Sequence, residues 1–218
     1  MSRILSLVTR RIERDILHRL LEGVDRDERV VYVTELVGCT LKPRLRRLAP
    51  MLAATVSFEP PVLIGSLVHA AVERIARSES SNVETEVEVS REVNGVLVKG
   101  RVDLLMRRDD GSIEEIVELK FTRRAPQQPK PHHVMQVRVY AEMLGCEDCR
   151  LYVAYLAPDR LAVYEVRRLN EPLLEPLVRD YLENTYAPRW DWECRYCPFR
   201  RICPKAPAEA KEREKGEG

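Results

Sequence analysis

An acidic pair followed by a lysine is the part of this sequence with the clearest chemical meaning. Asp103 precedes a tight-turn signal at residues 109–111, and Glu118-Leu119-Lys120 follows that turn. Side chains on a strand alternate between its faces, so Glu118 and Lys120 point the same way, and pairing about the turn brings Asp103 close to Glu118. Two neighbouring carboxylates repel each other, and a bound Mg²⁺ or Mn²⁺ would relieve that repulsion. Lys120 could orient a water molecule or stabilise charge on a phosphate, so the pattern favours phosphodiester cleavage.

An exposed acidic strand with a cross-strand salt bridge is the alternative interpretation of these residues. The surrounding sequence argues against it, because buried charges need a partner or a purpose. The apolar neighbours are Val102, Leu104, Leu105, Ile116, Val117 and Leu119.

Three further residues could serve such a site. His69 lies in the helical segment 64–77, and Gln136 and Tyr140 are four residues apart on a predicted helix, so they share a face. A lone histidine on an apolar face is usually a packing residue, and the Gln136–Tyr140 pair taken alone would be ordinary helix surface. His69 becomes a candidate metal ligand only because the acidic pair exists.

The six cysteines divide into a C-terminal group and three others. Cys194 and Cys197 have the spacing at which two thiols reach one metal ion, and Cys203 adds a third thiol, which leaves a fourth ligand to be found. Zinc is the default metal for this pattern in a cytosolic protein, and plain core cysteines are the other alternative. The remaining cysteines are Cys39, Cys146 and Cys149.

Cys146 and Cys149 flank Glu147-Asp148 between a predicted helix and a predicted strand. We expect these two cysteines to be buried or disulfide-bonded, since cytosolic proteins of thermophiles do form disulfides. A second metal site is the alternative.

The elements that must hold these residues follow from the apolar periodicity. Helical spacing predicts helices over residues 2–22, 41–53 with a break at Pro50, 64–77, 132–145 and 171–186. Alternation predicts strands over 83–93, 96–106, 113–121, 150–157 and 161–167, with a short extended segment at 30–33. Asn94-Gly95 is a strong hairpin signal between the first two strands. The order predicts an α/β or α+β protein whose mixed central sheet is flanked by helices.

The composition excludes several classes of protein. The chain has 218 residues, of which 44% are hydrophobic and 33% charged, so it is neither disordered nor fibrous. No apolar run approaches the roughly 18 residues of a membrane span, and the N-terminus has neither signal-peptide nor transit-peptide character, so we expect a cytoplasmic protein with no membrane contact. Arg outnumbers Lys by 29 to 7, and Asn plus Gln total only 7, a balance that fits a thermophile.

The net charge of +1 gives no general argument for nucleic-acid binding, so only local basic clusters could provide one. Arg44, Arg46 and Arg47 lie near Cys39, and Arg123-Arg124 follow Lys120. Basic clusters beside a phosphoryl-transfer site are suited to follow a DNA backbone, with a solvated surface as the alternative.

Taken together, the motifs resemble a known family. His69, Asp103, Glu118-Leu119-Lys120 and Gln136…Tyr140 occur in the order and spacing of the RecB-type nucleases of the PD-(D/E)XK superfamily, over residues 60–160. One departure from the superfamily name is Val102, which stands where a proline would precede Asp103.

The resemblance implies a role for each of these residues. His69, Asp103 and Glu118, with the backbone carbonyl of Leu119, would hold Mn²⁺ or Mg²⁺. Lys120 would assist catalysis. Gln136 and Tyr140 would help to position DNA or the metal site.

The cysteines extend the resemblance to nearly the whole chain. A RecB-like core with one cysteine before it and three after it resembles the CRISPR-associated RecB-like exonucleases, the fourth Cas family, and also the nuclease domain of AddB-type helicase–nucleases. In both groups four cysteines hold an iron–sulfur cluster that fastens the chain ends together, and here these would be Cys39, Cys194, Cys197 and Cys203. Most members carry 4Fe–4S and some carry 2Fe–2S, and four thiolates serve either cluster.

This resemblance also implies a domain organisation. One RecB-like nuclease domain would span residues 1–205, with its catalytic core at 60–167. Segments 30–50 and 188–205 would join at the iron–sulfur cluster as a cysteine-rich knot. The charged tail at 206–218 is expected to be disordered.

The function expected from these residues is a metal-dependent exonuclease acting on single-stranded DNA, typically 5′→3′, with a structural iron–sulfur cluster. The chain length, without a helicase, favours the CRISPR-associated family, whose members prepare spacer precursors together with CRISPR integrase proteins. The alternatives are a non-catalytic iron–sulfur module that binds DNA or protein, and a recombination-repair nuclease of the AddB type. The intact set of Asp103, Glu118 and Lys120 argues against the non-catalytic module, because a pure scaffold has no need of it.

Overall fold

The computed structural model describes residues 27–57 and 60–207, together with five isolated positions between residues 3 and 17. The helix predicted over residues 2–22 therefore lies for the most part outside the described residues, as does the tail from residue 208 onward.

A six-stranded mixed sheet forms the centre of the molecule. The strand order is β1-β3-β4-β5-β6, with β2 paired to β3 off this path. The β1–β3 and β4–β5 pairs are parallel, and the β2–β3, β3–β4 and β5–β6 pairs are antiparallel. The strands are β1 Val30–Tyr32, β2 Val83–Val93, β3 Val96–Arg107, β4 Ile113–Phe121, β5 Arg150–Leu156 and β6 Leu161–Glu165. The mixed central sheet expected from the sequence is therefore present.

Turn chemistry explains why β2, β3 and β4 form a meander. Asn94 and Gly95 have φ values of 50° and 73°, the left-handed pair that a two-residue hairpin turn requires. Gly111, with φ of 82°, serves the next turn. The parallel β4–β5 pair needs a crossover, which α6 (Pro131–Met143) provides.

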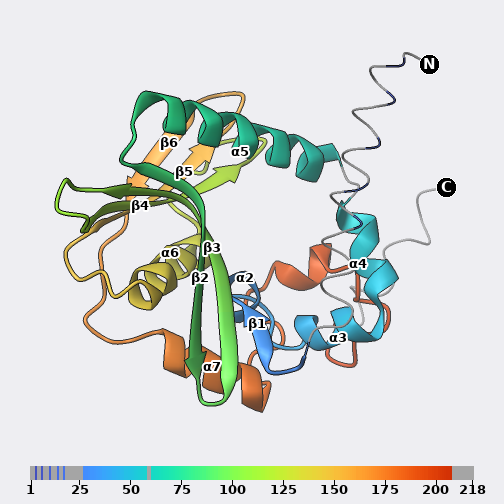
Figure 1. Ribbon diagram of the computed structural model, residues 1–218. Coiled ribbons are helices and arrows are strands. Elements are labelled where there is room, and N and C mark those ends of the chain that lie inside the picture. Colours follow the sequence, from blue (N-terminus) through green and yellow to red (C-terminus); the bar gives the residue numbers. More distant parts are fainter. Residues whose placement is uncertain are drawn as a thin grey trace.

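Helices cover both faces of the sheet. Gly65 of α5 (Pro60–Glu79) faces Phe121 of β4, whereas Gln136 of α6 approaches Glu118 from the other face, as the alternation along β4 requires. Figure 1 shows α5 along the top of the sheet and α6 beneath it, behind the long β2–β3 hairpin. The remaining helices are α2 Val33–Leu36, α3 Lys42–Leu48, α4 Pro50–Ser57, α7 Leu174–Glu183 and the 3₁₀ helix η1 Glu193–Tyr196.

Local sequence explains several helix boundaries. The break expected at Pro50 separates α3 from α4, because the residue before a proline, Ala49, is driven out of the helical region to φ −140° and ψ 66°. Helix α7 is shorter than the predicted 171–186. It starts where the Glu142 carboxylate accepts the N–H groups of Leu173 and Leu174, and it ends at Asn184, which adopts a left-handed φ of 55°.

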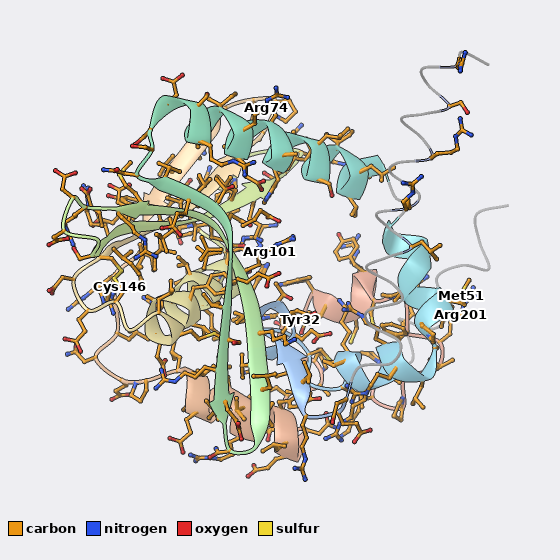
Figure 2. All side chains as sticks on the ribbon, viewed as in Figure 1. Tyr32, Met51, Arg74, Arg101, Cys146 and Arg201 are labelled. Atoms are coloured by element: carbon orange, nitrogen blue, oxygen red, sulfur yellow. A yellow bond between two sulfur atoms is a disulfide. The ribbon has the colours of Figure 1, made fainter. Side chains whose placement is uncertain are left out.

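Two apolar clusters stabilise the fold. The main cluster joins the sheet to α2, α6 and α7 and includes Val98, Ile116, Tyr140 and Val178. The smaller cluster joins Leu45 of α3 to Phe199 and Cys203 of the C-terminal segment. Figure 2 labels Met51 of α4 and Arg201 of the C-terminal segment in this part of the molecule. Among the described residues, no helix combines the length and the apolar character that a membrane crossing requires.

Candidate active site and cysteine cluster

One edge of β3 has a gap in its strand pairing at the residues predicted to be catalytic. On this edge, β1 pairs with residues 97–99 of β3, and β4 pairs with residues 104–107. Residues 100–103 lie between the two and have no strand partner on this side within the described chain. Since the β3–β4 ladder stops at Leu104–Val117, the next residues of each strand, Asp103 and Glu118, lie where the strands part.

Asp103 is held in this gap by the backbone of the neighbouring strand. Its Oδ2 accepts a hydrogen bond of 2.8 Å from the N–H of Leu119, and its Oδ1 lies 3.7 Å from Nδ1 of His69 on α5. His69 also hydrogen-bonds to the backbone of Leu119. The structure therefore brings together His69, Asp103 and the Leu119 backbone, as the sequence analysis expected of a metal site.

Glu118 is the most deeply buried acid of the group, with only 1% of its surface exposed. Burial, reinforced by the nearby Asp103 charge, raises the pKa of Glu118 to about 7, although Lys120 and Gln136 act in the opposite direction. Lys120 forms an ion pair with its Oε1, yet neither carboxylate oxygen accepts a hydrogen bond of good geometry within the described chain. Such a carboxylate is suited to bind a cation.

Lys120 and His69 carry the charge states that the proposed chemistry needs. Burial alone would lower the pKa of Lys120, but the carboxylates of Glu118 and Asp103 outweigh it and leave that pKa raised, so the lysine stays protonated. Burial lowers the pKa of His69 more than Asp103 raises it, so the imidazole is neutral near pH 7. A neutral imidazole can donate its lone pair to a metal ion.

The donor chemistry at the gap fits Mg²⁺ or Mn²⁺, which prefer carboxylate and carbonyl oxygens and accept imidazole. Within the described chain, no group of three or more His, Cys, Asp or Glu side chains is arranged to hold a metal ion. A site with one or two carboxylates is nevertheless usual for Mg²⁺, because waters and substrate phosphates complete its coordination.

Gln136 and Tyr140 lie on the buried face of α6, next to Glu118. Gln136 Nε2 donates to the Tyr140 hydroxyl at 3.1 Å, and both residues are at most 5% exposed. The Tyr140 ring lies against Gly100 so closely that a Cβ there would be only 2.5 Å from its Cε1. The pair therefore packs into the opening between the strands and is not ordinary helix surface.

Two acids beside the site were not identified from the sequence. Glu73, four residues after His69 on α5, is 7% exposed and hydrogen-bonds to Glu86 of β2. Burial, the Glu86 charge and Asp103 raise the pKa of Glu73 to about 7. Glu86 adopts a left-handed φ of 55° where the β2–β3 ladder passes from Thr85–Leu104 to Val87–Val102. The helical spacing of His69 and Glu73 is the signal that could have indicated the first of these acids.

A row of rings extends from Lys120 to the start of α6. Tyr155 of β5 is the register partner of Lys120, and its hydroxyl bonds to the backbone N–H of Lys130 and to Nδ1 of His133. The centroids of the His132 and His133 rings are 4.1 Å apart, with the rings tilted by 59°. Burial and the charges of Lys120 and Lys130 lower the pKa of His132 to about 4 and that of His133 to about 2, so both rings are neutral near pH 7.

The four cysteines expected to bind one cluster line a single small pocket. Cys39, Cys194, Cys197 and Cys203 all face it, and Lys42, Arg200 and Lys205 line it as well. All four are free thiols. Burial raises the pKa of Cys39, Cys194 and Cys197, and neighbouring thiols add to each shift. The sulfurs stand near one another without reaching metal-binding distances. Sulfur donors beside basic residues fit an anionic thiolate cluster.

Hydrogen bonds hold this pocket together across the length of the chain. The backbone N–H of Cys39 donates to Glu193 Oε1 at 2.8 Å, and Glu193 Oε2 accepts from the N–H groups of Arg189 and Trp190. The Trp190 indole donates to the carbonyl of Val37 at 2.8 Å. Glu193 was not identified from the sequence, because an acid beside a cysteine gives no signal of a partner 154 positions away.

Cys146 and Cys149 form a disulfide, so the first of the two alternatives for them is confirmed and a second metal site is not formed. They lie at the end of α6 remote from Gln136.

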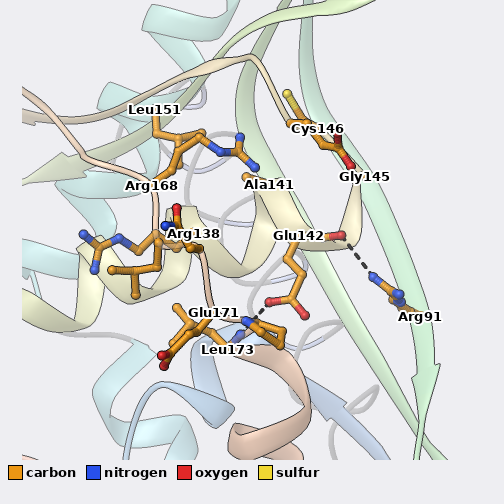
Figure 3. Close-up of a pocket in the computed structure, with 14 residues that line it drawn as sticks. Arg91, Arg138, Ala141, Glu142, Gly145, Cys146, Leu151, Arg168, Glu171 and Leu173 are labelled. Atoms are coloured by element: carbon orange, nitrogen blue, oxygen red, sulfur yellow. Dashed lines mark hydrogen bonds between the residues drawn. The ribbon is translucent and has the colours of Figure 1, made fainter.

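A cavity of about 350 Å³ adjoins Cys146 and is lined by Arg91, Arg138 and Glu142 among others. Figure 3 shows Glu142 in this cavity bonded to the backbone at the start of α7, while Arg91 bonds to its carbonyl. None of the predicted catalytic residues lines this cavity.

The two arginine clusters differ in their surroundings. Arg44 bonds to the carbonyl of Leu182, Arg46 pairs with Glu35 and Arg47 pairs with Glu28. All three residues lie on α3, and Figure 1 shows α3 well apart from β4. Arg123 and Arg124 are exposed directly after β4, beside the candidate site.

Comparison with known proteins agrees with this geometry. The family model of the PD-(D/E)XK nuclease superfamily matches residues 76–204. The CRISPR-associated exonuclease Cas4 of Saccharolobus solfataricus is 35% identical over 187 residues, which is 82% of this chain and 89% of that protein.

Solved structures show the same relationship. The crystal structure of SSO0001 covers 92% of this chain and 98% of its own, with a TM-score of 0.80 and 31% identity. An alkaline exonuclease from Laribacter hongkongensis covers 76% of this chain and 89% of its own, but with a TM-score of 0.44 and 14% identity we draw nothing from it. The predicted resemblance, the fold class and the assignment as an exonuclease are confirmed. The chain belongs to the PD-(D/E)XK nuclease superfamily and, within it, to the CRISPR-associated Cas4 exonucleases.

Proposed function

We propose that this chain is a divalent-metal-dependent exonuclease that degrades single-stranded DNA in the 5′→3′ direction. The observation that carries the proposal is the meeting of Asp103, Glu118 and Lys120 with His69 where β3 and β4 part. The strand type and the direction rest on the resemblance to the CRISPR-associated RecB-like exonucleases.

The residues at the gap fit the metal that this superfamily uses. His69, Asp103, Glu118 and the Leu119 carbonyl would hold Mn²⁺ or Mg²⁺, which supplies an activated water and neutralises charge on the phosphate. Asp103 is already oriented by the Leu119 N–H, which leaves its other oxygen directed toward His69. The two acids are therefore presented from adjacent strands without rearrangement of the backbone.

Lys120 and α6 supply the protein's own contribution to the reaction. The protonated Lys120 is held beside Glu118 and can donate to a phosphate oxygen as negative charge develops. Gln136 lies between Glu118 and the Tyr140 hydroxyl and fixes the orientation of the acid. Gln136 and Tyr140 act in this scheme by positioning Glu118.

We infer further that Cys39, Cys194, Cys197 and Cys203 bind an iron–sulfur cluster with a structural role, with 4Fe–4S favoured over 2Fe–2S. The shared pocket and its basic lining support this assignment. Iron–sulfur chemistry is not needed to hydrolyse a phosphodiester, and the cluster would instead join segments 30–50 and 188–205 of one nuclease domain.

The biological setting proposed for the enzyme is CRISPR adaptation in the cytoplasm. There it would trim spacer precursors and work with the integrase proteins. The sequence identity of 35% to a CRISPR-associated exonuclease, over 82% of this chain, supports this setting over recombination repair.

A nuclease assay tests the proposed activity. Single-stranded DNA labelled at the 5′ or the 3′ end should release its 5′ nucleotides first with Mn²⁺, and EDTA should abolish the release. Asp103→Ala should be folded and inactive, whereas Asp109→Ala, an exposed acid of the adjacent turn, should be fully active. Full cleavage by a folded Asp103→Ala protein would overturn the site assignment, and release from the 3′ end would overturn the direction.

Iron content and visible absorbance test the cluster. Freshly purified protein should be coloured, and alanine at any of the four cysteines should bleach it and lower its melting temperature. A colourless protein that contains one zinc ion would refute the iron–sulfur assignment.

A further inference from the structure

We propose that Trp192 and His132 form a stacking platform for a nucleobase of the DNA strand bound at the Asp103–Glu118 gap. The cysteine-rich segment would then form one wall of the substrate path. This inference rests on the proposed function, because it assumes that a single strand enters the gap.

Trp192 is unusually exposed for its type. Its side chain is 45% exposed, although an indole usually buries most of its surface in a folded protein. Its ring lies 4.9 Å from the His132 ring, tilted by 46°. Within the described chain the indole N–H has no hydrogen-bond partner, and only the backbone carbonyl of Trp192 accepts a bond, from the N–H of Arg195.

The neighbouring Trp190 shows what a structural tryptophan looks like in the same segment. Its indole donates a hydrogen bond of 2.8 Å to the carbonyl of Val37, and its ring is 6.0 Å from His132. Trp190 therefore anchors the segment to α2. Trp192, two residues later, presents its ring to solvent over the same histidine.

The platform is continuous with the candidate active site. His132 contacts His133, and the His133 ring lies 5.5 Å from Tyr155, the register partner of Lys120. One helical turn after His132, Gln136 reaches Glu118. A base on Trp192 would therefore belong to a nucleotide near the one whose phosphate meets Lys120.

The chemistry of the platform suits single-stranded DNA of any sequence. Every base has a π face, so stacking on aromatic rings binds without sequence preference. Bases in a duplex are already stacked on one another, so only an unpaired strand can use the platform. Lys130 at the start of α6, and Arg123 and Arg124 after β4, are exposed basic side chains that could contact phosphates of such a strand.

Binding measurements on the full-length protein, with its cluster and without divalent metal, test the platform. We expect Trp192→Ala to weaken binding of fluorescein-labelled oligo(dT) roughly five- to 150-fold, the range for loss of one base-stacking ring, while Trp192→Phe retains most of the affinity. The matched control is Tyr196→Ala, which removes a ring 68% exposed in the same segment that packs against Arg195 and has no ring contact with His132. Visible absorbance must be unchanged in each variant.

An oligonucleotide with abasic sites separates stacking from charge. The abasic oligonucleotide keeps the phosphates and lacks the bases. The wild type should therefore bind it about as weakly as Trp192→Ala binds oligo(dT). The Trp192→Ala variant should bind oligo(dT) and the abasic oligonucleotide with similar affinity. The platform would be overturned if Trp192→Ala lost equal affinity for oligo(dT) and for the abasic oligonucleotide, or lost no affinity for oligo(dT). Cleavage of DNA by the wild type would in that case leave the proposed function standing. Failure of wild type to cut DNA would instead overturn the proposed function itself.

Discussion

Gly100→Ala offers the sharpest test of how the site is packed. Gly100 lies on β3 three residues before Asp103, and a methyl group there would be 2.5 Å from Tyr140 Cε1, 3.0 Å from Val33 Cγ2 and 3.2 Å from Val89 Cγ2. Contacts below 3.0 Å are not tolerated, and the Tyr140 ring is 2% exposed with no free space to move into. Either the ring or β3 must shift.

The size of the effect follows from overpacking. Forcing one methyl group into a closed core costs about 1–3 kcal/mol of unfolding free energy, which corresponds to a fall in melting temperature of about 2–12 °C for a chain of this size. The shift of Tyr140 should also disturb Gln136, which it hydrogen-bonds at 3.1 Å, and through Gln136 the orientation of Glu118. We therefore expect kcat to fall even when the variant is assayed well below its melting temperature.

A double variant identifies the cause. Tyr140→Leu removes the ring atom that clashes, so Gly100→Ala should cost less stability in the Tyr140→Leu background than in the wild type. Urea unfolding of the four proteins gives this coupling, and single-turnover cleavage gives the rate. If Gly100→Ala changes stability by less than about 0.5 kcal/mol and leaves kcat intact, the close approach of Tyr140 to β3 is not what fixes Glu118.

Five further predictions concern single residues. Lys120→Ala should lower kcat steeply with little change in DNA affinity, and His69→Ala should lose activity at limiting Mn²⁺ and regain part of it at high Mn²⁺; no loss at limiting Mn²⁺ would make His69 a packing residue. Glu193→Ala leaves three backbone N–H groups without their acceptor and should cost about 3 kcal/mol or more in urea unfolding, with release of iron. His133, with a pKa of about 2 when folded and 6.5 when unfolded, stays neutral in the native state, so lowering the pH from 7 to 5 protonates this ring only in the unfolded chain. Over that range the wild type should therefore lose about 2 kcal/mol more unfolding free energy than His133→Asn, which keeps the other titrating groups. Cys146→Ala should keep the visible absorbance, because its disulfide lies outside the cluster pocket, and bleaching of this variant would contradict the ligand assignment.

The elements defined by local sequence were predictable. The bounds of β2 and β4 agree with the predicted 83–93 and 113–121, because alternation and turn residues are both local signals. The same alternation placed Glu118 beside Lys120, and the turn placed Asp103 near Glu118. The four cysteines were grouped by resemblance, and the structure brings them to one pocket.

The residues that sequence did not reveal are those whose role depends on a distant partner. Glu73 is buried only because β2 brings Glu86 against α5, and Glu193 matters only because residues 37–39 lie beside it. Helix α7 starts late because Glu142, about 30 residues earlier, caps it. Arg46 pairs with Glu35, and the sequence gives no sign that Glu35 faces α3. Charge patterning alone cannot separate a paired arginine from a free one.

The cysteine-rich segment touches both sides of the gap that holds the catalytic residues. On one side, Trp190 and Arg189 bond to the carbonyls of Val37 and Gly38, at the end of α2. Helix α2 follows β1 directly, and β1 closes the edge of β3 at residues 97–99, just before the gap at 100–103. On the other side, the Trp190 ring lies 6.0 Å from the ring of His132 in the first turn of α6, the helix that carries Gln136. A cluster in the cysteine pocket would thus fix the position of β3 and of α6 together. Such a cluster would influence phosphodiester cleavage through these contacts, without taking part in the chemistry.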